Sequence, residues 1–419
     1  MVAPAVARPD LIRHPDFVKL WIAESISVAG SQISQLAIPF LAIVLLEASA
    51  FEVGLLTAVG FLPFLLFGLP AGVWVDRLRR RPILIAADVG RAALLATIPL
   101  AWLLSSITLP QLYLVTFLAG VLTVFFDVGY QSYLPSLVDR DQLMEGNGKL
   151  EMSRASAQVA GPGLAGGLVQ IAGAPLAIAI DSVSFLVSGL FLVTIRRPEP
   201  LPSGDRPSTS ILEDIREGLR FVLGDRLLRP ITASTAIANL FGSIASSVML
   251  IFAVRELRLD AVLIGLIIAI GSGGGIVGAI VASRVQRRIG VGWTLIVCGC
   301  GFGAGYLLVP LSAVAAPVVF ATAGIFLATL SATIFSIVGL TLRQNMAPRR
   351  MQGRTNATVR TINWGVLPIG FFVGGVLGTL TGIVPTLVVG AVGLLLTAIP
   401  VFFSPVRSLR EMPPPVEDH

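Results

Sequence analysis

Four carboxylates lie inside long apolar stretches of this 419-residue chain, where acidic side chains are rare. Placing a charge at the centre of a bilayer costs about 2.5–3.5 kcal/mol, so such residues usually face a cavity, pair with a cation or bind a proton. A buried carboxylate that takes up and releases a proton can couple the movement of a solute to a proton gradient. The four residues are Glu24, Asp88, Asp127 and Asp181.

The sequence around each acid separates the expected roles. Arg91 follows Asp88 by one helical turn, so we expect these two residues to form an ion pair. Glu24 has no local partner and is our leading proton-coupling candidate, with substrate recognition or pairing with Arg91 as the alternatives. Asp181 is the second proton-coupling candidate, although a protonated or hydrogen-bonded packing role is more usual for such a residue.

The composition indicates a polytopic membrane protein. Hydrophobic residues make up 55% of the chain and charged residues 13%, well below the roughly 25% of soluble domains. The net charge of +6 does not indicate nucleic-acid binding, because Lys and Arg are confined to loops and helix ends. Twelve runs long enough to cross a bilayer are expected near 17–46, 52–75, 82–104, 109–133, 153–173, 175–195, 229–253, 262–283, 293–312, 316–340, 355–378 and 383–403.

These runs form two halves of similar length, which predicts an all-α membrane protein with two six-helix bundles. If both termini are cytoplasmic, all of the 30 basic residues except Arg255 and Arg258 lie on the cytoplasmic side or in helix ends there, as the positive-inside rule requires. The expected segments are a cytoplasmic N-terminal segment 1–16, an N-terminal bundle 17–195, a cytoplasmic linker 196–228 with an amphipathic helix, a C-terminal bundle 229–403 and a cytoplasmic tail 404–419.

A basic cluster follows the second apolar run directly. Gly72, Asp76, Arg77, Arg80 and Arg81 are spaced as Gly-x-x-x-Asp-Arg-x-x-Arg-Arg. The glycine permits close helix approach, the aspartate can accept hydrogen bonds from a helix start, and the arginines can pair with carboxylates on neighbouring helices. The cluster can therefore form a latch that closes one face of the bundle, or it can serve only as a topology marker.

This cluster, between the second and third spans, resembles the inner-loop signature of the major facilitator superfamily, and a weaker copy recurs at 283–288. Arg79 stands where the family usually has glycine, which resembles the branch that contains macrolide and enterobactin-type siderophore exporters. The resemblance implies two pseudo-symmetric bundles, alternating access and a monomer. It also implies that Asp127 receives the arginines of the latch, and we expect Arg154 and Arg360 to anchor helices or join that network.

A second pattern lies in the fifth span. Gly161, Pro162, Gly166 and Gly167 resemble the Gly-Pro-x-x-Gly-Gly motif associated with antiporters of the superfamily, although Ala165 replaces one glycine. Proline bends a membrane helix and glycines let another helix pack tightly. The motif is expected to restrict leakage through the seam between the halves, and an ordinary packing face of small residues is the alternative.

Polar residues at helical spacing mark one side of the first, fourth, seventh and tenth spans, which line the cavity in the resembled fold. Transporters of this kind bind substrate near the midplane between the halves, although a Ser or Thr in a membrane helix more often bonds to a neighbouring helix. Few fixed charges accompany these stripes, which favours a bulky amphiphilic compound. The cavity candidates are Ser31, Gln35, Thr123, Asn239, Ser243 and Thr333.

We therefore expect a multi-pass carrier of the plasma (inner) membrane that exports a small amphiphile such as a drug, macrolide or siderophore, with protons as the coupling ion. Lys19 and Lys149 are the two lysines, and neither lies in a phosphate-binding Gly-x-x-x-x-Gly-Lys-Ser/Thr sequence, so no ATP motor is expected. The two histidines, His14 and His419, lie in terminal segments, and neither an enzyme site, a metal site nor a cofactor is predicted. The alternatives are an importer, a lysolipid flippase or a non-transporting sensor.

Overall fold

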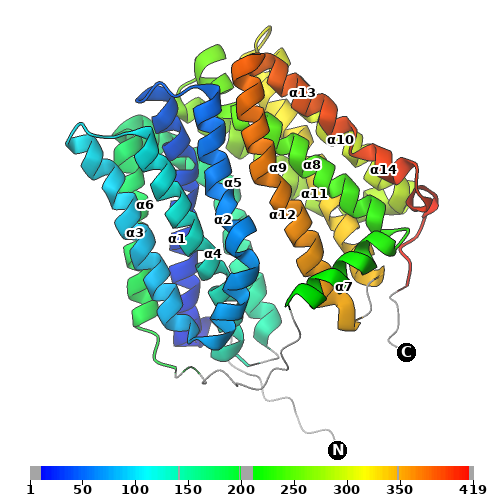
Figure 1. The fold of residues 1–419 in the computed structure, drawn as a ribbon, viewed down its shortest axis with the longest axis horizontal. Helices are drawn as coiled ribbons and strands as arrows, with labels where there is room; N and C mark the ends of the chain where they lie inside the picture. Colours follow the sequence, from blue (N-terminus) through cyan, green and yellow to red (C-terminus); the bar gives the residue numbers. More distant parts are fainter. Residues whose placement is uncertain (1–10, 140–141, 198, 200–210, 347–348, 415–419) are drawn as a thin grey trace, which may run out of the picture.

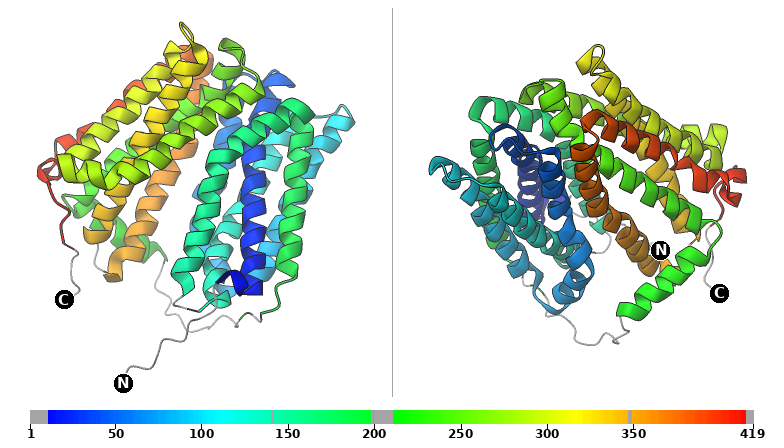
Figure 2. Two further views of the ribbon diagram at one scale, coloured as in Figure 1. Left: turned by 180° about the vertical axis from the view of Figure 1, so that it is seen from behind. Right: turned by 45° about the horizontal axis from the view of Figure 1, so that its top comes forward.

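A computed structural model describes residues 11–139, 142–197, 199, 211–346 and 349–414, and within these ranges the chain forms helices and no strand. Figure 1 shows two helical bundles side by side, seen from further directions in Figure 2. The N-terminal half comprises α1 (Pro15–Val44), α2 (Ala50–Arg77), α3 (Arg80–Leu103), α4 (Leu109–Leu137), α5 (Leu143–Ala172) and α6 (Ala174–Val193).

The C-terminal half repeats this arrangement after an intervening helix, α7 (Ile211–Gly224), which lies in the segment where an amphipathic helix is predicted and packs on α12 and α8. Its elements are α8 (Leu228–Ile251), the π-helical turn η3 (Phe252–Glu256), α9 (Ala261–Ile289), α10 (Val291–Leu311), α11 (Pro317–Met346), α12 (Arg349–Leu380), α13 (Ile383–Leu395) and α14 (Ala398–Phe402).

Eleven of the described helices are long and apolar enough to cross a membrane, judged by length and composition. Besides the short helix α7, the helix outside this set is α5, which has charged residues in its first half and glycines in its second. At 30 residues it is long enough to span a bilayer. With α5 included, the count agrees with the twelve spans that the sequence predicts.

Short signals set the turns between helices. Ser49 and Glu52 form a reciprocal capping box at the start of α2, and the Asp260 carboxylate accepts a hydrogen bond from the Leu263 amide at the start of α9. Gly173 and Gly290 adopt φ values of 82° and 84°, which allow α5–α6 and α9–α10 to reverse direction at a single residue.

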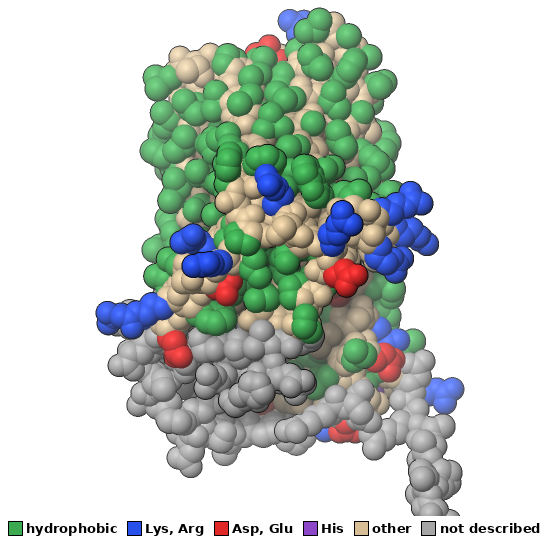
Figure 3. All heavy atoms as spheres, turned by 90° about the vertical axis from the view of Figure 1, so that its right-hand side faces the viewer, with side chains coloured by type: hydrophobic (Ala, Val, Ile, Leu, Met, Phe, Trp, Pro, Cys, Tyr) green, Lys and Arg blue, Asp and Glu red, His purple; other side chains and the backbone are tan. Residues whose placement is uncertain are grey.

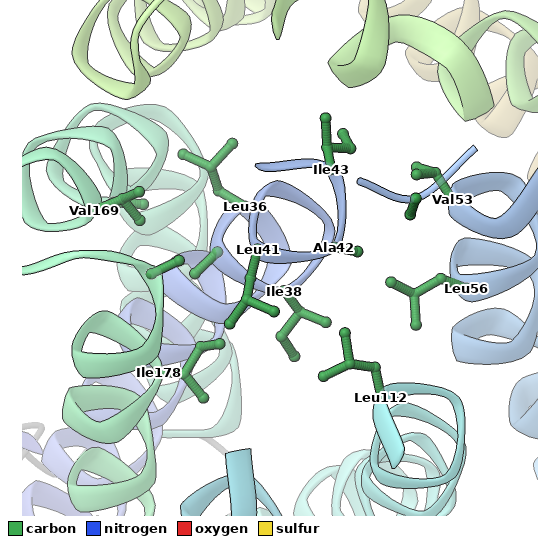
Figure 4. Close-up of a cluster of buried hydrophobic side chains, with 14 of the residues drawn as sticks. Leu36, Ile38, Leu41, Ala42, Ile43, Val53, Leu56, Leu112, Val169 and Ile178 are labelled. Atoms are coloured by element: carbon green, nitrogen blue, oxygen red, sulfur yellow. The ribbon is translucent and has the colours of Figure 1, made fainter. Parts of the chain in front are cut away.

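The two ends of the molecule pack differently. We call the end with the start of α1, the end of α6 and α7 the linker end, and the opposite end, with the end of α1 and the start of α9, the far end. Toward the far end one buried hydrophobic cluster contains residues of both halves, including Ile38, Leu56, Ile178, Phe252 and Ile264. Figure 4 shows its N-terminal part, where α1 side chains meet those of neighbouring helices. At the linker end each half has a separate cluster.

The halves meet mainly through two helix pairs, α2 with α12 and α5 with α9, and α8 also contacts α1 and α2. Near the far end of α2, Gly54 lies against the backbone of Gly375, so a side chain at either position would displace the partner helix. Closer to the linker end, no described atom lies within 4 Å of where a Cβ of Gly68 or Gly72 would stand. The halves are therefore in close contact at the far end, whereas no described atom fills the space beside Gly68 and Gly72 toward the linker end.

Candidate substrate cavity

A cavity of about 830 Å³ lies between the two halves. Helices of both halves line it, with α1 to α6 from the N-terminal half and α8 to α12 from the C-terminal half. This volume lies in the upper part of the 300–1,000 Å³ range of small-molecule sites. The position between two bundles that touch at one end makes this cavity the candidate substrate site.

An ion pair between α1 and α5 forms part of the cavity wall. Arg154 Nη2 lies 3.0 Å from Glu24 Oε1, and the Glu24 side chain is only 3% exposed while that of Arg154 is 32% exposed. Within the described residues Glu24 Oε2 is buried without a hydrogen-bond partner. The pair therefore combines a partly exposed guanidinium with a buried carboxylate. One oxygen of this carboxylate remains free to bind a proton or a ligand group.

Asp127 lies in the same wall, on α4. Arg154, Arg91 and Arg360 act on its carboxylate through Coulomb attraction, and Asp127 and Glu24 repel each other. Arg154 thus attracts two carboxylates, those of Glu24 and Asp127. A change of charge on either acid changes the force on Arg154 and on the other acid.

Arg91 forms the ion pair with Asp88 that the sequence predicts. Arg91 Nη2 lies 2.5 Å from Asp88 Oδ1, and Ser188 Oγ donates to Asp88 Oδ2 at 2.7 Å. The Arg91 guanidinium also lies 4.4 Å and 4.1 Å from the ring centres of Phe126 and Phe185. These contacts join α3, α4 and α6 through one guanidinium, whose Nε is buried without a hydrogen-bond partner among the described residues.

Asp181 is fully buried on α6 and accepts hydrogen bonds from Ser34 of α1 and Ser184 of its own helix. Gly30 of α1 allows this approach, because a Cβ there would collide with Ser184 and Asp181. The hydrogen-bonded packing that the sequence analysis gives as an alternative is therefore present, and the residue remains a second proton-site candidate.

Aromatic rings from α2 and α12 form the opposite wall. Phe61 stacks on Phe371 with 5.2 Å between ring centres, and Phe64 lies 5.0 Å from Trp364. All four residues line the cavity, and the Arg360 guanidinium lies 5.5 Å from the Trp364 ring centre. These rings bridge the two halves and face the cavity at the same time.

The six predicted cavity residues divide evenly. Ser31, Gln35 and Thr123 line the cavity, and the other three do not. Asn239 Nδ2 donates to the Asn363 carbonyl, Ser243 Oγ donates to the carbonyl of Asn239 on its own helix, and Thr333 lies against Gly275 and Gly278 of α9. Asn239, Ser243 and Thr333 are thus turned to backbone or neighbouring helices of the C-terminal half, which is the alternative fate of polar residues in membrane helices.

The inner-gate motif is described only in part, because the side chains of Asp76 and Arg77 lie outside the described residues. Arg80 and Arg81 donate their backbone amides to the Glu199 carboxylate at 2.7 Å and 3.2 Å, so Glu199 caps the start of α3. The Arg81 guanidinium donates to the carbonyl of Leu192 at the end of α6. These two arginines therefore contact Glu199 and α6, whereas Asp127 lies in the cavity wall.

The antiporter-like motif lies at the seam between the halves. A Cβ on Gly166 would collide with the backbone of Ala261 and Gly265 on α9, and one on Gly161 with Gln32 of α1. Gly265 in turn lies against the Pro162 carbonyl, whereas Gly167 has no described atom near its Cβ position. Three of the four motif residues therefore support close packing of α5 on α1 and α9.

Sequence reasoning missed Arg154 as the partner of Glu24, Trp364 in the aromatic wall and Glu199 at the start of α3. Glu24 and Arg154 are 130 positions apart, and no spacing in the sequence joins them. A signal was present for Trp364, because an aromatic residue four positions after Arg360 in an apolar helix can stack on that guanidinium.

Comparison with known families identifies relatives over nearly the whole chain. The family model described as "Transmembrane secretion effector" matches residues 9–415. The multidrug efflux pump Tap of Mycolicibacterium fortuitum is 26% identical over 396 residues, covering 92% of this chain and 94% of Tap. Macrolide efflux protein A of Streptococcus pyogenes is 26% identical over 206 residues, and this match spans about half the length of each protein, 48% and 50%.

Solved structures show the same architecture. A bacterial homologue of the iron transporter ferroportin in an inward-facing state superposes with a TM-score of 0.75 at 19% identity, over 94% of this chain and 99% of that one. A bacterial homologue of the lysosomal transporter Spinster, inward-facing and unoccupied, gives 0.70 at 15% identity, over 94% and 97%. At these identities the likeness concerns the fold.

Proposed function

We propose that this chain, which belongs to the transmembrane secretion effector family of the major facilitator superfamily, exports small amphiphilic compounds by proton-coupled antiport. As a member of this family it is a multi-pass membrane transporter and not an enzyme. The observation that carries this proposal is the Glu24–Arg154 pair in the wall of the cavity between the halves. Related chains named as multidrug and macrolide efflux proteins support export as the direction.

Proton exchange at Glu24 gives the coupling step. The charged carboxylate holds Arg154 at 3.0 Å. When a proton neutralises Glu24, this attraction disappears. Arg154 is then drawn to the carboxylate of Asp127, with which it already interacts electrostatically. Substrate and proton then compete for the Glu24 carboxylate. A substrate that displaces Arg154 or binds the free Glu24 oxygen stabilises one protonation state of Glu24 over the other.

Alternating access follows from the difference between the two ends. The far end is closed by a hydrophobic cluster shared between the halves, and the linker end has separate clusters. Gly68 and Gly72 offer open space on α2, so a rocking motion of the halves could bring another helix against them. The substrate would enter from the linker end and leave at the far end.

The distribution of basic residues supports a cytoplasmic linker end. Figure 3 shows one face of the molecule, with hydrophobic side chains over its upper part and Lys and Arg gathered below them. Arg284, Arg287 and Arg288 lie in the last turns of α9 at the linker end, while Arg255 and Arg258 lie near the far end. By the positive-inside rule this distribution supports the proposal that the linker end and both termini are cytoplasmic.

The cavity chemistry favours an amphiphilic cargo. The aromatic wall of Phe61, Phe64, Trp364 and Phe371 can stack on planar or apolar groups, and the opposite wall supplies acidic and basic groups for one polar contact. Among the described residues no group of three or more His, Cys, Asp or Glu side chains could hold a metal ion.

Transport into energised inverted membrane vesicles tests the proposal. Vesicles containing the protein should accumulate a lipophilic cation or a macrolide, and an uncoupler should abolish the accumulation. Accumulation that survives the uncoupler would contradict proton coupling. Uptake only into right-side-out vesicles would indicate an importer, movement of a lysolipid alone a flippase, and no movement of any solute a sensor.

A further inference from the structure

The segment that links α8 to α9 at the far end has an unusual backbone. Its first part, η3, is a π-helical turn over Phe252–Glu256, and the Leu257 and Leu259 amides donate to the carbonyls of Phe252 and Ala253 at 3.1 Å and 3.0 Å. Arg258 adopts a positive φ of 53°, which is uncommon for a residue with a side chain. π-Helical turns are rare and are found frequently at functional sites.

This segment forms a roof over the cavity. Phe252, Ala253, Leu257 and Leu259 all line it. Phe252 is also 1% exposed and belongs to the far-end cluster that contains residues of both halves. A movement of this segment would therefore open the cavity and break the shared core together.

One side chain of the segment reaches the opposite half. Arg255 Nη2 donates to the Ala48 carbonyl, in the loop between α1 and α2, at 2.8 Å. Ala48 is 1% exposed, so the acceptor lies at the edge of the shared core. A second bond between the halves lies next to it, from the Phe51 amide to Thr379 Oγ1 of α12 at 3.1 Å.

Arg258 provides the contrast within the same segment. It lies three positions further on, carries the same charge and is exposed, as Arg255 also is. Within the described residues it makes neither an ion pair nor a hydrogen bond through its guanidinium. Both arginines are exceptions to the positive-inside rule, so topology explains neither of them. The bond to the opposite half distinguishes Arg255 from Arg258.

We infer that Arg255 is a positioning residue of the transport cycle, which holds the roof segment 252–259 against the N-terminal half and must release Ala48 each time the cavity opens at the far end. A charged donor bonded to a backbone carbonyl stabilises the closed far end in preference to the open one, since the bond exists only when the halves are in contact. The inference rests on the alternating-access part of the proposed function and is independent of proton coupling.

The test measures access to the cavity from the far side. In the full-length protein with Cys298→Ser and Cys300→Ser, Thr57→Cys places a single thiol in the cavity wall. A membrane-impermeant thiol reagent added to intact cells reaches this thiol only while the far end is open. Arg255→Gln should raise the labelling rate roughly three- to tenfold, the shift expected from losing one hydrogen bond in a two-state equilibrium.

Arg258→Gln is the matched control, because it removes the same charge from the same segment. Its labelling rate should equal that of the Thr57→Cys parent, and Arg255→Lys should fall between the parent and Arg255→Gln. Equal rates for Arg255→Gln and Arg258→Gln would overturn the inference. The assay needs neither a known substrate nor a proton gradient, so failure of proton coupling would leave its result readable.

Discussion

The two halves share one helical arrangement but differ in chemistry. In the N-terminal half, α1, α3, α4 and α6 each contain a buried or cavity-lining carboxylate. In residues 228–403 the only acids are Glu256 and Asp260, and both lie in the segment that connects α8 to α9 at the far end. The comparison teaches that a pseudo-symmetric carrier can place its intramembrane carboxylates in one half and leave the other to supply walls and seams.

Packing in the C-terminal half fits this division. Gly274 and Gly278 of α9 lie against the Phe326 and Leu330 carbonyls of α11, and Gly305 of α10 lies against α11 as well. Backbone-to-backbone contacts of this kind lock helices together without charged groups. These contacts hold α9, α10 and α11 together, whereas the acids of the N-terminal half are the groups that the proposed proton exchange would use.

The largest expected effect follows from removing Arg91. Arg91→Ala leaves Asp88 buried without its cation, and breaking a buried pair in this way costs about 3–5 kcal/mol. We expect most of the folded protein to be lost, measured as monodisperse yield after solubilisation. Arg360→Ala removes an exposed guanidinium on α12 and should leave the yield unchanged, so equal losses would contradict the assignment of the structural charges to the N-terminal half.

Removing Arg154 should affect transport more than folding. Its side chain is 32% exposed, so Arg154→Gln should fold while gradient-driven transport falls by roughly 10- to 100-fold, as expected for a lost charge-assisted hydrogen bond of about 1.5–3 kcal/mol. Arg154→Lys keeps the charge and should recover part of the rate. Normal accumulation by Arg154→Gln would remove the ion pair from the mechanism.

A smaller effect is expected in the aromatic wall. Trp364→Ala removes a ring that lies 5.0 Å from Phe64, and aromatic contacts contribute about 0.5–1.5 kcal/mol. The half-saturation concentration for an aromatic substrate should rise roughly two- to tenfold with little change in maximal rate. Trp293→Ala alters an exposed tryptophan on α10 and serves as the control, because it does not line the cavity.

The smallest effect compares two serines in the two halves. Ser31 and Ser243 each donate to the carbonyl four residues earlier, but only Ser31 lines the cavity. Ser31→Ala should raise the half-saturation concentration about two- to threefold if the hydroxyl contacts substrate, and Ser243→Ala should match the wild type. A larger effect of Ser243→Ala would indicate that the seventh span contributes to substrate binding.

Local sequence signals predicted the features that are determined within a single helix or by the pattern of apolar runs. The membrane class, the two halves and the Asp88–Arg91 pair follow from apolar runs and from a three-residue spacing. The Glu24–Arg154 pair depends on how α1 packs on α5, which no local pattern contains. Asn239, Ser243 and Thr333 show a second limit, because a polar stripe has the same spacing whether it faces a cavity or a neighbouring helix.

The most direct test of the central claim is Glu24→Gln in proteoliposomes, measured in two assays. Glutamine preserves the shape of the side chain but can neither be charged nor exchange a proton. We predict that accumulation driven by a pH gradient is lost, while exchange of labelled for unlabelled substrate without a gradient continues. Gradient-driven accumulation at the wild-type level would contradict the role of Glu24 as the coupling group.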